Sequence, residues 1–315
     1  MIVALDTTPL SAAPGGIARY TAQLLAALRA CYPDDRVVGL TDRNASLGPL
    51  RRQWWSVGLP LALREQRVAV FHGTDFAVPY LPVCAAVMTV HDLSPWRAEF
   101  RAATSGRVRR RTPWLLKLNL ATLVITPTEA VRREVIEQFR LPAGRVCVTP
   151  LGVALTPGAE GKEDFVLAVG SGARKNLETA RRAAEGIAPL RIVDRDVTDA
   201  ELASLYTRAR ALLMPSLYEG FGLPALEAMA CGTPVLAARD AALVEVCGGA
   251  AEHIDAGDIA AWRGALQALL ASSERASAMA EAGLRHARAF TWERTARLTH
   301  AVYEEAQRRH GSAHG

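Results

Sequence analysis

Short apolar runs alternate with longer amphipathic stretches along the whole chain. Apolar residues recur every three to four positions in the longer stretches, and this pattern predicts helices between strands. In the first half, strands are predicted near residues 2–5, 37–40, 68–71, 85–90, 123–126 and 146–149, and helices near residues 17–30, 106–120 and 129–139. Such alternation is typical of a parallel sheet covered by helices. The pattern therefore predicts an α/β protein whose first half is one Rossmann-like domain.

A turn-rich segment over residues 150–164 interrupts the alternation and is typical of a linker. A second series of strands follows near residues 165–169, 191–193, 211–214, 235–238 and 251–254, and helical patterns dominate from residue 258 onwards. Because single cores stop growing at about 250–300 residues, a chain of 315 residues favours two domains. We expect an N-terminal domain over residues 1–151, a second Rossmann-like domain over 152–290, and a C-terminal helix over 291–315 that could cross back to the first domain.

Composition and charge narrow the class of protein only slightly. Half of the residues are apolar and 22% are charged, as in soluble globular proteins. The start of the chain lacks the features of a signal peptide and no segment has the roughly 18 consecutive apolar residues of a membrane span, so a cytoplasmic protein is expected. The five scattered cysteines indicate neither a disulfide framework nor a zinc site. A net charge of +5 fits phosphate ligands or an anionic membrane but is common in ordinary enzymes. We expect no nucleic-acid partner.

The strongest chemical signal lies over residues 215–234, which read Pro-Ser-Leu-Tyr-Glu-Gly-Phe-Gly-Leu-Pro-Ala-Leu-Glu-Ala-Met-Ala-Cys-Gly-Thr-Pro. The segment follows an apolar run and opens a short helix, since proline suits a first helical turn and glycine ends one. Gly220 and Gly222 let the backbone approach a ligand closely. We expect the free amides of residues 222–225 to form an anion site with the helix dipole, which suits a diphosphate.

Two carboxylates flank this expected anion site. Glu219 lies in the loop and Glu227 lies inside the helix, so one can reach a sugar and the other a ribose. A capped helix with tightly packed glycines and solvated carboxylates would show the same Gly-x-Gly pattern, so that pattern alone leaves both interpretations open.

Taken whole, the segment resembles the Glu-Gly-Phe-Gly-Leu-Pro-x-x-Glu-Ala-Met-Ala-x-Gly-x-Pro signature of retaining GT-B glycosyltransferases. This family, glycosyltransferase group 1, includes bacterial mannosyltransferases and sucrose synthases. The resemblance implies two Rossmann-like domains that face a cleft, a nucleotide-diphosphate sugar as donor, and net retention at the anomeric carbon. It also implies that Glu219 is catalytic. Donor-binding residues implied by the same segment are Gly220, Phe221, Gly222, Leu223 and Glu227.

A second segment extends the resemblance. Gly170 and the run Arg174-Lys175-Asn176 follow the first strand of the second domain, like the Gly…Arg-Lys-Asn segment of the family, whose basic pair binds the donor diphosphate. A guanidinium fork and an ammonium at a strand's carboxyl end can neutralise a leaving diphosphate. An Arg-Lys pair at a helix start is otherwise more often simply solvated. We therefore expect Gly170, Arg174 and Lys175 to bind the donor.

In the first domain, Gly15 and Gly16 precede a predicted helix and resemble the family's glycine-rich first loop, which passes close to the donor phosphates. His91 follows a strand within a Thr-Val-His-Asp-Leu-Ser-Pro run that resembles the family's His-Asp motif, whose histidine contacts the transferred sugar. A lone histidine at a strand end is more often structural, but this context favours a catalytic His91. His72, at the end of another strand, is interpreted as structural.

The chain departs from the family between Asn176 and Tyr206, where only one convincing strand is predicted. The second domain is thus expected to be shortened by one β-α unit, and part of the wall around the nucleotide base would be lost. This departure supports an alternative function, a catalytically weakened nucleotide-sugar binding protein.

We expect Arg174, Lys175 and helix N–H groups to neutralise the leaving diphosphate, and therefore expect no metal, no cofactor and a metal-independent hexosyltransferase. The His-Asp-Leu-Ser-Pro run resembles bacterial mannosyltransferases of polysaccharide biosynthesis, which favours GDP-mannose as donor, with UDP-glucose second. The acceptor is expected to be a saccharide or a lipid-linked sugar. Arginines interleave with apolar residues over the helix at 106–120, which could place the protein peripherally at the inner membrane face. A core-packed helix with a solvated basic face explains the same pattern.

Overall fold

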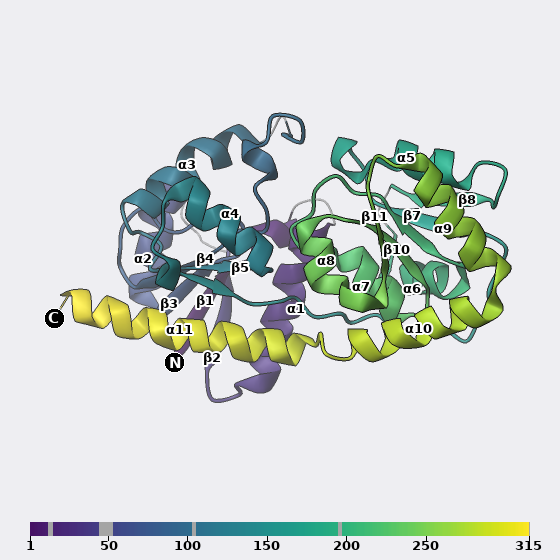
Figure 1. The fold of residues 1–315 in the computed structure, drawn as a ribbon. Helices are drawn as coiled ribbons and strands as arrows, with labels where there is room; N and C mark the ends of the chain where they lie inside the picture. The colour runs from purple at the N-terminus through teal and green to yellow at the C-terminus, as the bar shows by residue number, and fades with distance from the viewer. Residues whose placement is uncertain (12–14, 44–52, 103–104, 195–196, 315) are drawn as a thin grey trace. The chain divides into compact units, whose positions relative to one another are not determined.

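The computed structural model describes residues 1–11, 15–43, 53–102, 105–194 and 197–314 (Figure 1). The chain forms two compact units. Unit 1 comprises Met1–Arg97, Arg101–Leu151 and Trp292–Gly315, and unit 2 comprises Ala98–Phe100 and Gly152–Thr291. The expected boundaries, after residues 151 and 290, thus lie within one residue of this division, and the C-terminal helix belongs to unit 1.

Unit 1 contains a six-stranded parallel sheet in the order β2-β1-β3-β4-β5-β6. Its strands are β1 (Ile2–Asp6), β2 (Arg36–Leu40), β3 (Val70–Gly73), β4 (Ala85–Thr89), β5 (Leu123–Thr126) and β6 (Val146–Val148). Strands covered on both faces read as continuous apolar runs, and every residue of β3, β4 and β5 is buried. The apolar runs therefore predicted these strands because both faces of the sheet are covered.

Five α-helices are described in unit 1: α1 (Gly16–Cys31), α2 (Leu59–Glu65), α3 (Gly106–Lys117), α4 (Glu129–Phe139) and α11 (Trp292–His314). The sequence pattern did not predict α2, which follows a π-helical turn over Trp54–Gly58. Its end also explains why β3 begins two residues later than predicted: Val68 donates its N–H to the carbonyl of Leu63 and so still belongs to the turn that closes α2.

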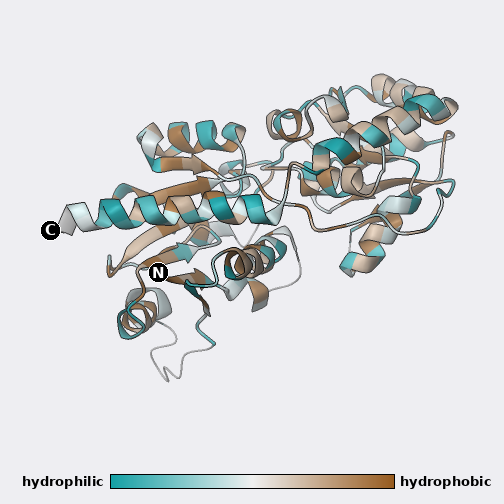
Figure 2. Cartoon of the chain, turned by 90° about the horizontal axis from the view of Figure 1, so that it is seen from below, coloured by the Kyte–Doolittle hydropathy of each residue, from teal (hydrophilic) through white to brown (hydrophobic). Residues whose placement is uncertain are grey.

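The long helix α11 packs against α1 and against the sheet strands β3, β4 and β5 (Figure 1). Three polar contacts fix it along its length. Thr295 donates to the carbonyl of Pro150 at 2.7 Å, His300 contacts Asp35 at 2.8 Å, and the Tyr303 hydroxyl lies 2.6 Å from Nδ1 of His72. The apolar strands and the mixed colouring of α11 are visible in Figure 2. Residues from both ends of the sequence thus build unit 1.

Unit 2 contains a five-stranded parallel sheet in the order β11-β10-β9-β7-β8. Its strands, each within one residue of its predicted position, are β7 (Val166–Val169), β8 (Leu190–Val193), β9 (Leu212–Met214), β10 (Val235–Ala238) and β11 (Glu252–Ile254). Its helices are α5 (Leu177–Ala184), α6 (Asp199–Arg208), α7 (Leu223–Ala230), α8 (Ala241–Cys247), α9 (Ile259–Ala271) and α10 (Ser273–Ala287). Within the described part of the segment between α5 and α6, β8 is the only strand.

Each sheet has a point where the chain reverses the direction in which strands are added. In unit 2 this point lies between β7 and β9, and in unit 1 it lies between β1 and β3. Loops that leave two such strands diverge at their carboxyl ends and leave a crevice, which is where open α/β sheets bind ligands. The candidate residues predicted from the sequence lie in these loops, in the loop after β4, or in the helices α1 and α7 that follow them.

Candidate functional site

Lys175 and Glu219 form a buried ion pair at the carboxyl ends of β7 and β9. Nζ of Lys175 donates to Oε1 of Glu219 at 2.5 Å, and the two side chains are only 10% and 6% exposed. The sequence predicted each residue as a separate ligand group, whereas the structure brings them together. Charges this deeply buried must be paired. The pair therefore holds an ammonium and a carboxylate at the switch point of unit 2, each neutralising the other.

Gly170 makes room for this lysine. The residue ends β7 with φ at +118°, and a Cβ atom added there would lie 2.7 Å from Cε of Lys175. A side chain at position 170 would thus be strained and would displace the lysine. The role that the structure gives to Gly170 is to let the Lys175 side chain lie directly over the strand end.

The turn that carries Arg174 and Lys175 is tied to two neighbouring loops. Leu217 donates its N–H to the carbonyl of Arg174 at 2.8 Å. Asn176 has a left-handed backbone, and its side-chain amide donates to the carbonyls of Pro215 at 3.1 Å and Ala256 at 3.0 Å. The loops after β7, β9 and β11 therefore form one hydrogen-bonded edge. Sequence reasoning gave Asn176 no such role.

Asp240 adds a second carboxylate to the surroundings of Glu219. It caps α8 by accepting hydrogen bonds from the N–H groups of Ala242 and Leu243. Burial raises the pKa of Asp240, the neighbouring Glu219 charge raises it further, and hydrogen bonds from backbone amides, including that of Glu219, lower it. Sequence reasoning missed this residue, although an aspartate directly after β10 was a usable signal.

The start of α7 offers fewer amides than expected. Gly222 is the N-cap with φ at +94°, and a Cβ there would lie 2.4 Å from a methyl group of Leu243. The prediction of four free amides at residues 222–225 is wrong, because Pro224 has no N–H and Ala225 donates to the carbonyl of Gly222 at 2.9 Å. Among the described residues, the amides of Gly222 and Leu223 have no acceptor. These two remain available for an anion.

Glu227 lies inside α7 and is buried. The hydroxyl of Tyr206, a fully buried residue of α6, donates to its Oε2 at 3.1 Å. A neutral donor therefore orients this carboxylate, in contrast to the ammonium that holds Glu219. The Phe221 ring is also buried and packs edge-on against Phe290 at 6.1 Å, so Phe221 anchors the loop that carries Gly220.

In unit 1, His91 follows β4 and Gly15 and Gly16 begin α1. Nε2 of His91 lies 2.8 Å from the carbonyl of Thr74, and its ring meets Tyr20 edge-on at 4.9 Å. Because a carbonyl only accepts, Nε2 of His91 donates this hydrogen bond, and when the ring is neutral its Nδ1 can accept another. A Cβ at Gly16 would meet nothing within 4 Å, so packing does not require glycine there.

His72 belongs to the core. Its Nδ1 contacts Tyr303 and its Nε2 contacts Thr89 Oγ1 at 2.7 Å, and the Tyr20 hydroxyl reaches the same threonine at 3.0 Å. Burial lowers the pKa of His72 to about 3, with a smaller contribution from His91. The neutral imidazole thus links α11 to the end of β4, just before His91, which agrees with its interpretation as structural.

The helix α3 packs part of its apolar side into unit 1 and exposes the rest. Leu115 and Leu116 are buried in the core of unit 1, while Trp114 and Leu118 are 46% and 52% exposed. The core-packed helix that the sequence left open thus accounts for the two buried leucines. No helix over the described residues is both long and apolar enough to span a bilayer. Those residues also contain no group of three or more potential metal ligands.

Comparison with known proteins matches both units to glycosyltransferase families. Residues 159–286 match the family model described as glycosyl transferases group 1, and residues 14–156 match that of glycosyltransferase family 4. The chain is 31% identical over 304 residues to O-antigen chain mannosyltransferase B of Escherichia coli, covering 81% of this chain and 77% of that protein. It is 40% identical over 125 residues to MMP alpha-(1->4)-mannosyltransferase of Mycolicibacterium hassiacum, a match that spans 38% of this chain and 30% of that one.

Solved structures show the same fold. Sucrose-phosphate synthase from Thermosynechococcus elongatus superposes with a TM-score of 0.75 at 21% identity, covering 96% of this chain and 98% of that one. Anabaena HepE in complex with UDP and glucose gives a TM-score of 0.69 at 16% identity, covering 96% and 99%. The predicted α/β fold with two parallel-sheet domains is thereby confirmed.

Proposed function

Because the chain belongs to the group 1 glycosyltransferases of the GT-B fold, we propose that it transfers a hexose from a nucleotide-diphosphate sugar to a saccharide or lipid-linked acceptor, with net retention. Mannose is the first candidate, because the relatives from E. coli and M. hassiacum are both named mannosyltransferases. GDP-mannose is thus the favoured donor and UDP-glucose the second. The observation that carries the proposal is the buried Lys175–Glu219 pair at the switch point of unit 2.

The pair suits a ligand that carries both phosphate and sugar. A diphosphate beside Lys175 would replace the carboxylate as partner of the ammonium, and Arg174 and the amides of Gly222 and Leu223 would supply further donors. The Glu219 carboxylate would then accept a hydrogen bond from the sugar. One buried pair would thus provide both an anion site and a sugar site when the donor enters.

Transfer breaks the bond between C1 of the sugar and the diphosphate oxygen, and a bond forms between C1 and the acceptor oxygen. The acceptor proton passes to the departing diphosphate, so the charges balance. Positive charge develops on the sugar as the first bond breaks, and the Glu219 carboxylate would stabilise it while Lys175 and Arg174 neutralise the leaving group. For His91 we propose a hydrogen bond at Nδ1 from a hydroxyl of the transferred sugar. Glu227, oriented by Tyr206, is proposed to bind the ribose.

Glu219→Gln is the direct test. We expect transfer to fall at least about a hundredfold, equivalent to roughly 3 kcal/mol of barrier, while GDP binding stays near that of the natural protein. Glu281→Gln is a matched control, since Glu281 is a strongly exposed carboxylate of the same unit. Near-normal turnover of Glu219→Gln would refute the catalytic role of this residue.

Donor binding is tested by calorimetric titration. We expect GDP and UDP to bind within about tenfold of each other, or roughly 1.4 kcal/mol, because the diphosphate contacts dominate, and the monophosphates to bind much more weakly. Arg174→Ala combined with Lys175→Ala should abolish binding of both diphosphates, and EDTA should leave binding and transfer unchanged. Loss of activity with EDTA would contradict metal independence. A preference for one base well beyond tenfold would show a specific base pocket.

The second candidate function is a nucleotide-sugar binding protein with weakened catalysis. It is favoured by the single strand β8 in the described segment between α5 and α6, where relatives are expected to have more of the base-binding wall. Donor binding without either transfer or donor hydrolysis would select this function.

A peripheral position at the membrane is also proposed, with the exposed Trp114 and Leu118 as its contacts. Flotation with vesicles of phosphatidylcholine, alone or with phosphatidylglycerol, tests it. If replacing Trp114 and Leu118 by serine left vesicle binding unchanged, these side chains would not be the membrane contact.

A further inference from the structure

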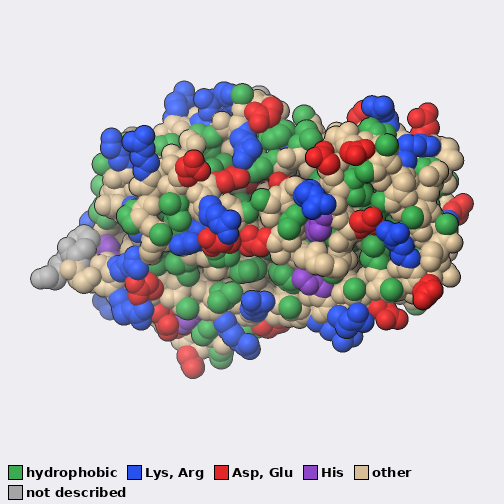
Figure 3. Space-filling view, in the orientation of Figure 1, with side chains coloured by type: hydrophobic (Ala, Val, Ile, Leu, Met, Phe, Trp, Pro, Cys, Tyr) green, Lys and Arg blue, Asp and Glu red, His purple; other side chains and the backbone are tan. Residues whose placement is uncertain are grey.

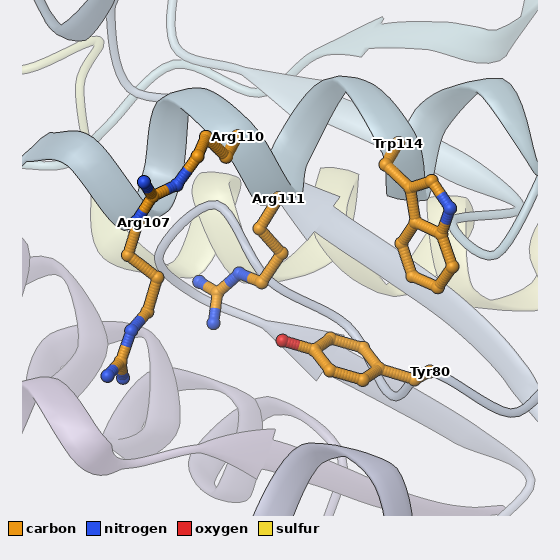
Figure 4. A pocket seen from close by; sticks show the side chains of 5 residues that line it. All are labelled: Tyr80, Arg107, Arg110, Arg111 and Trp114. Atoms are coloured by element: carbon orange, nitrogen blue, oxygen red, sulfur yellow. The ribbon is translucent and has the colours of Figure 1, made fainter.

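One face of α3 carries arginines followed by an aromatic residue. Arg107, Arg110, Arg111 and Trp114 recur at spacings of three to four residues, so they lie on the same side of the helix. With Tyr80 they line a pocket of about 290 Å³ (Figure 4). That volume lies at the lower limit of small-molecule sites. In Figure 4, the Tyr80 hydroxyl points toward the guanidinium of Arg111.

Arg111 is the inner wall of this pocket. Its guanidinium carbon lies 5.0 Å above the ring of Trp55, which holds the group in place. Its Nε atom is buried and has no hydrogen-bond partner among the described residues. Buried donors are nearly always satisfied by protein, water or a ligand. The orphaned Nε–H therefore marks a place for an acceptor that the described residues do not supply, as a bound ligand would.

The pocket carries excess positive charge. Within the described part of the chain, no carboxylate pairs with Arg107 or Arg110. Arg111 is partly compensated: burial raises the pKa of Asp75, and the charges of His91 and Arg111 lower it. Figure 3 shows the blue basic side chains gathered over α3. Among the described residues, Arg107 and Arg110 thus have no counter-charge, while Arg111 shares the carboxylate of Asp75 with His91.

These features match a phosphate ester. Guanidinium groups bind phosphate oxygens through paired, charge-assisted hydrogen bonds, and a cluster of them suits a dianion better than a single carboxylate. Tyr80 and Trp114 meet edge-on at 5.6 Å beside the arginines and offer an apolar wall for the group attached to the phosphate. The pocket is therefore suited to a phosphate with a sugar or hydrocarbon next to it.

We propose that this pocket binds a phosphate group of the glycosyl acceptor. The inference rests on the proposed transferase function, and it makes the substrate class more specific: the acceptor is a phosphorylated saccharide or a sugar linked to lipid through phosphate. The shared chemistry is the phosphate ester. Arg107, Arg110 and Arg111 bind its oxygens, and Trp114 and Tyr80 contact the adjoining group.

The experiment measures phosphate-ester binding on the full chain with its nucleotide site filled by saturating GDP. The soluble probe is glucose 1-phosphate, followed by calorimetry, with glucose as the uncharged reference. The membrane probe is vesicles of phosphatidylcholine with or without phosphatidylglycerol, followed by flotation. The variants are Arg107→Gln with Arg110→Gln, and Arg109→Gln as the matched control, because Arg109 lies on the same helix but does not line the pocket.

We expect glucose 1-phosphate, but not glucose, to bind, and the double variant to weaken this binding at least tenfold while Arg109→Gln changes it less than twofold. Binding only to phosphatidylglycerol vesicles, with the same dependence on Arg107 and Arg110, supports the pocket and assigns its phosphate to lipid. Equal effects of the double variant and the control, or no binding of either probe, overturn the proposal. GDP affinity is measured for every variant, and we expect it to stay unchanged. If the natural protein did not bind GDP, the proposed transferase function would be refuted, independently of the phosphate pocket.

Discussion

Replacement of Lys175 by alanine tests the buried pair most directly. The Glu219 carboxylate would keep its place in the loop after β9 but lose the ammonium 2.5 Å away. Removing one partner of a buried pair typically costs about 3–5 kcal/mol, because the other charge stays buried and unpaired. Since a unit of this size loses about 2–4 °C per kcal/mol, we expect the melting temperature of unit 2 to fall by about 10 °C.

The double variant Lys175→Met with Glu219→Gln separates pairing from packing. With neither charge present, the desolvation cost also disappears, and we expect most of the lost stability to return. Arg285→Ala is the control, because its pair with Glu281 is 67% and 70% exposed and such pairs contribute about 0–1 kcal/mol.

Differential scanning calorimetry gives the stability, and hydrogen exchange of peptides from each unit assigns the loss to unit 2. Saturating GDP provides a second measurement. At a hundred times its Kd, a ligand stabilises the native state by about 2.7 kcal/mol, and we expect this gain in the natural protein but not in Lys175→Ala. If Lys175→Ala costs no more than the exposed control, or if the double variant is as unstable as Lys175→Ala, the buried pair does not hold this site.

Three further predictions follow from the geometry. Gly170→Ala should weaken GDP binding at least tenfold by displacing the Lys175 side chain. Gly264→Ala, in α9 of the same unit, where a Cβ meets nothing within 4 Å, should leave GDP binding unchanged; calorimetric titration compares the two variants. Tyr206→Phe should cost about 1–3 kcal/mol in chemical unfolding, because it removes one hydrogen bond to the buried Glu227 carboxylate. The variant should weaken donor binding less than Glu227→Ala does. The pKa of His72 falls from 6.5 to about 3 on folding, so between these pH values the unfolded chain binds one proton more than the folded chain. This residue therefore makes the free energy of unfolding fall by up to about 1.4 kcal/mol per pH unit as the pH drops below 6.5. His72→Gln should reduce the difference in unfolding free energy between urea melts at pH 7 and pH 5.

The sequence predicted the central strands well, because β4, β5, β9 and β10 are fully buried apolar runs in sheets covered on both faces. It failed at α2, where seven residues are too few to show a helical period, and at the start of β3, which depends on a hydrogen bond back to that helix. Glu219 and Lys175 were predicted separately as ligand groups. Their pairing follows from β7 and β9 being neighbours, and strand order is a property of the tertiary fold. Tyr206 was missed for the same reason, whereas Asp240 could have been found from its place between β10 and α8.

The position of α11 sets an order of events during synthesis. All of unit 2, Ala98–Phe100 and Gly152–Thr291, precedes α11 in the chain, whereas unit 1 needs Trp292–His314 to cover its sheet. While a ribosome still holds the last segment, unit 2 can already fold, but β3 and β4 lack their covering helix and His72 lacks the hydroxyl of Tyr303. One apolar face of the sheet in unit 1 thus stays uncovered until unit 2 and then α11 have emerged from the ribosome. A chaperone that binds apolar surface would meet this protein at residues 1–151.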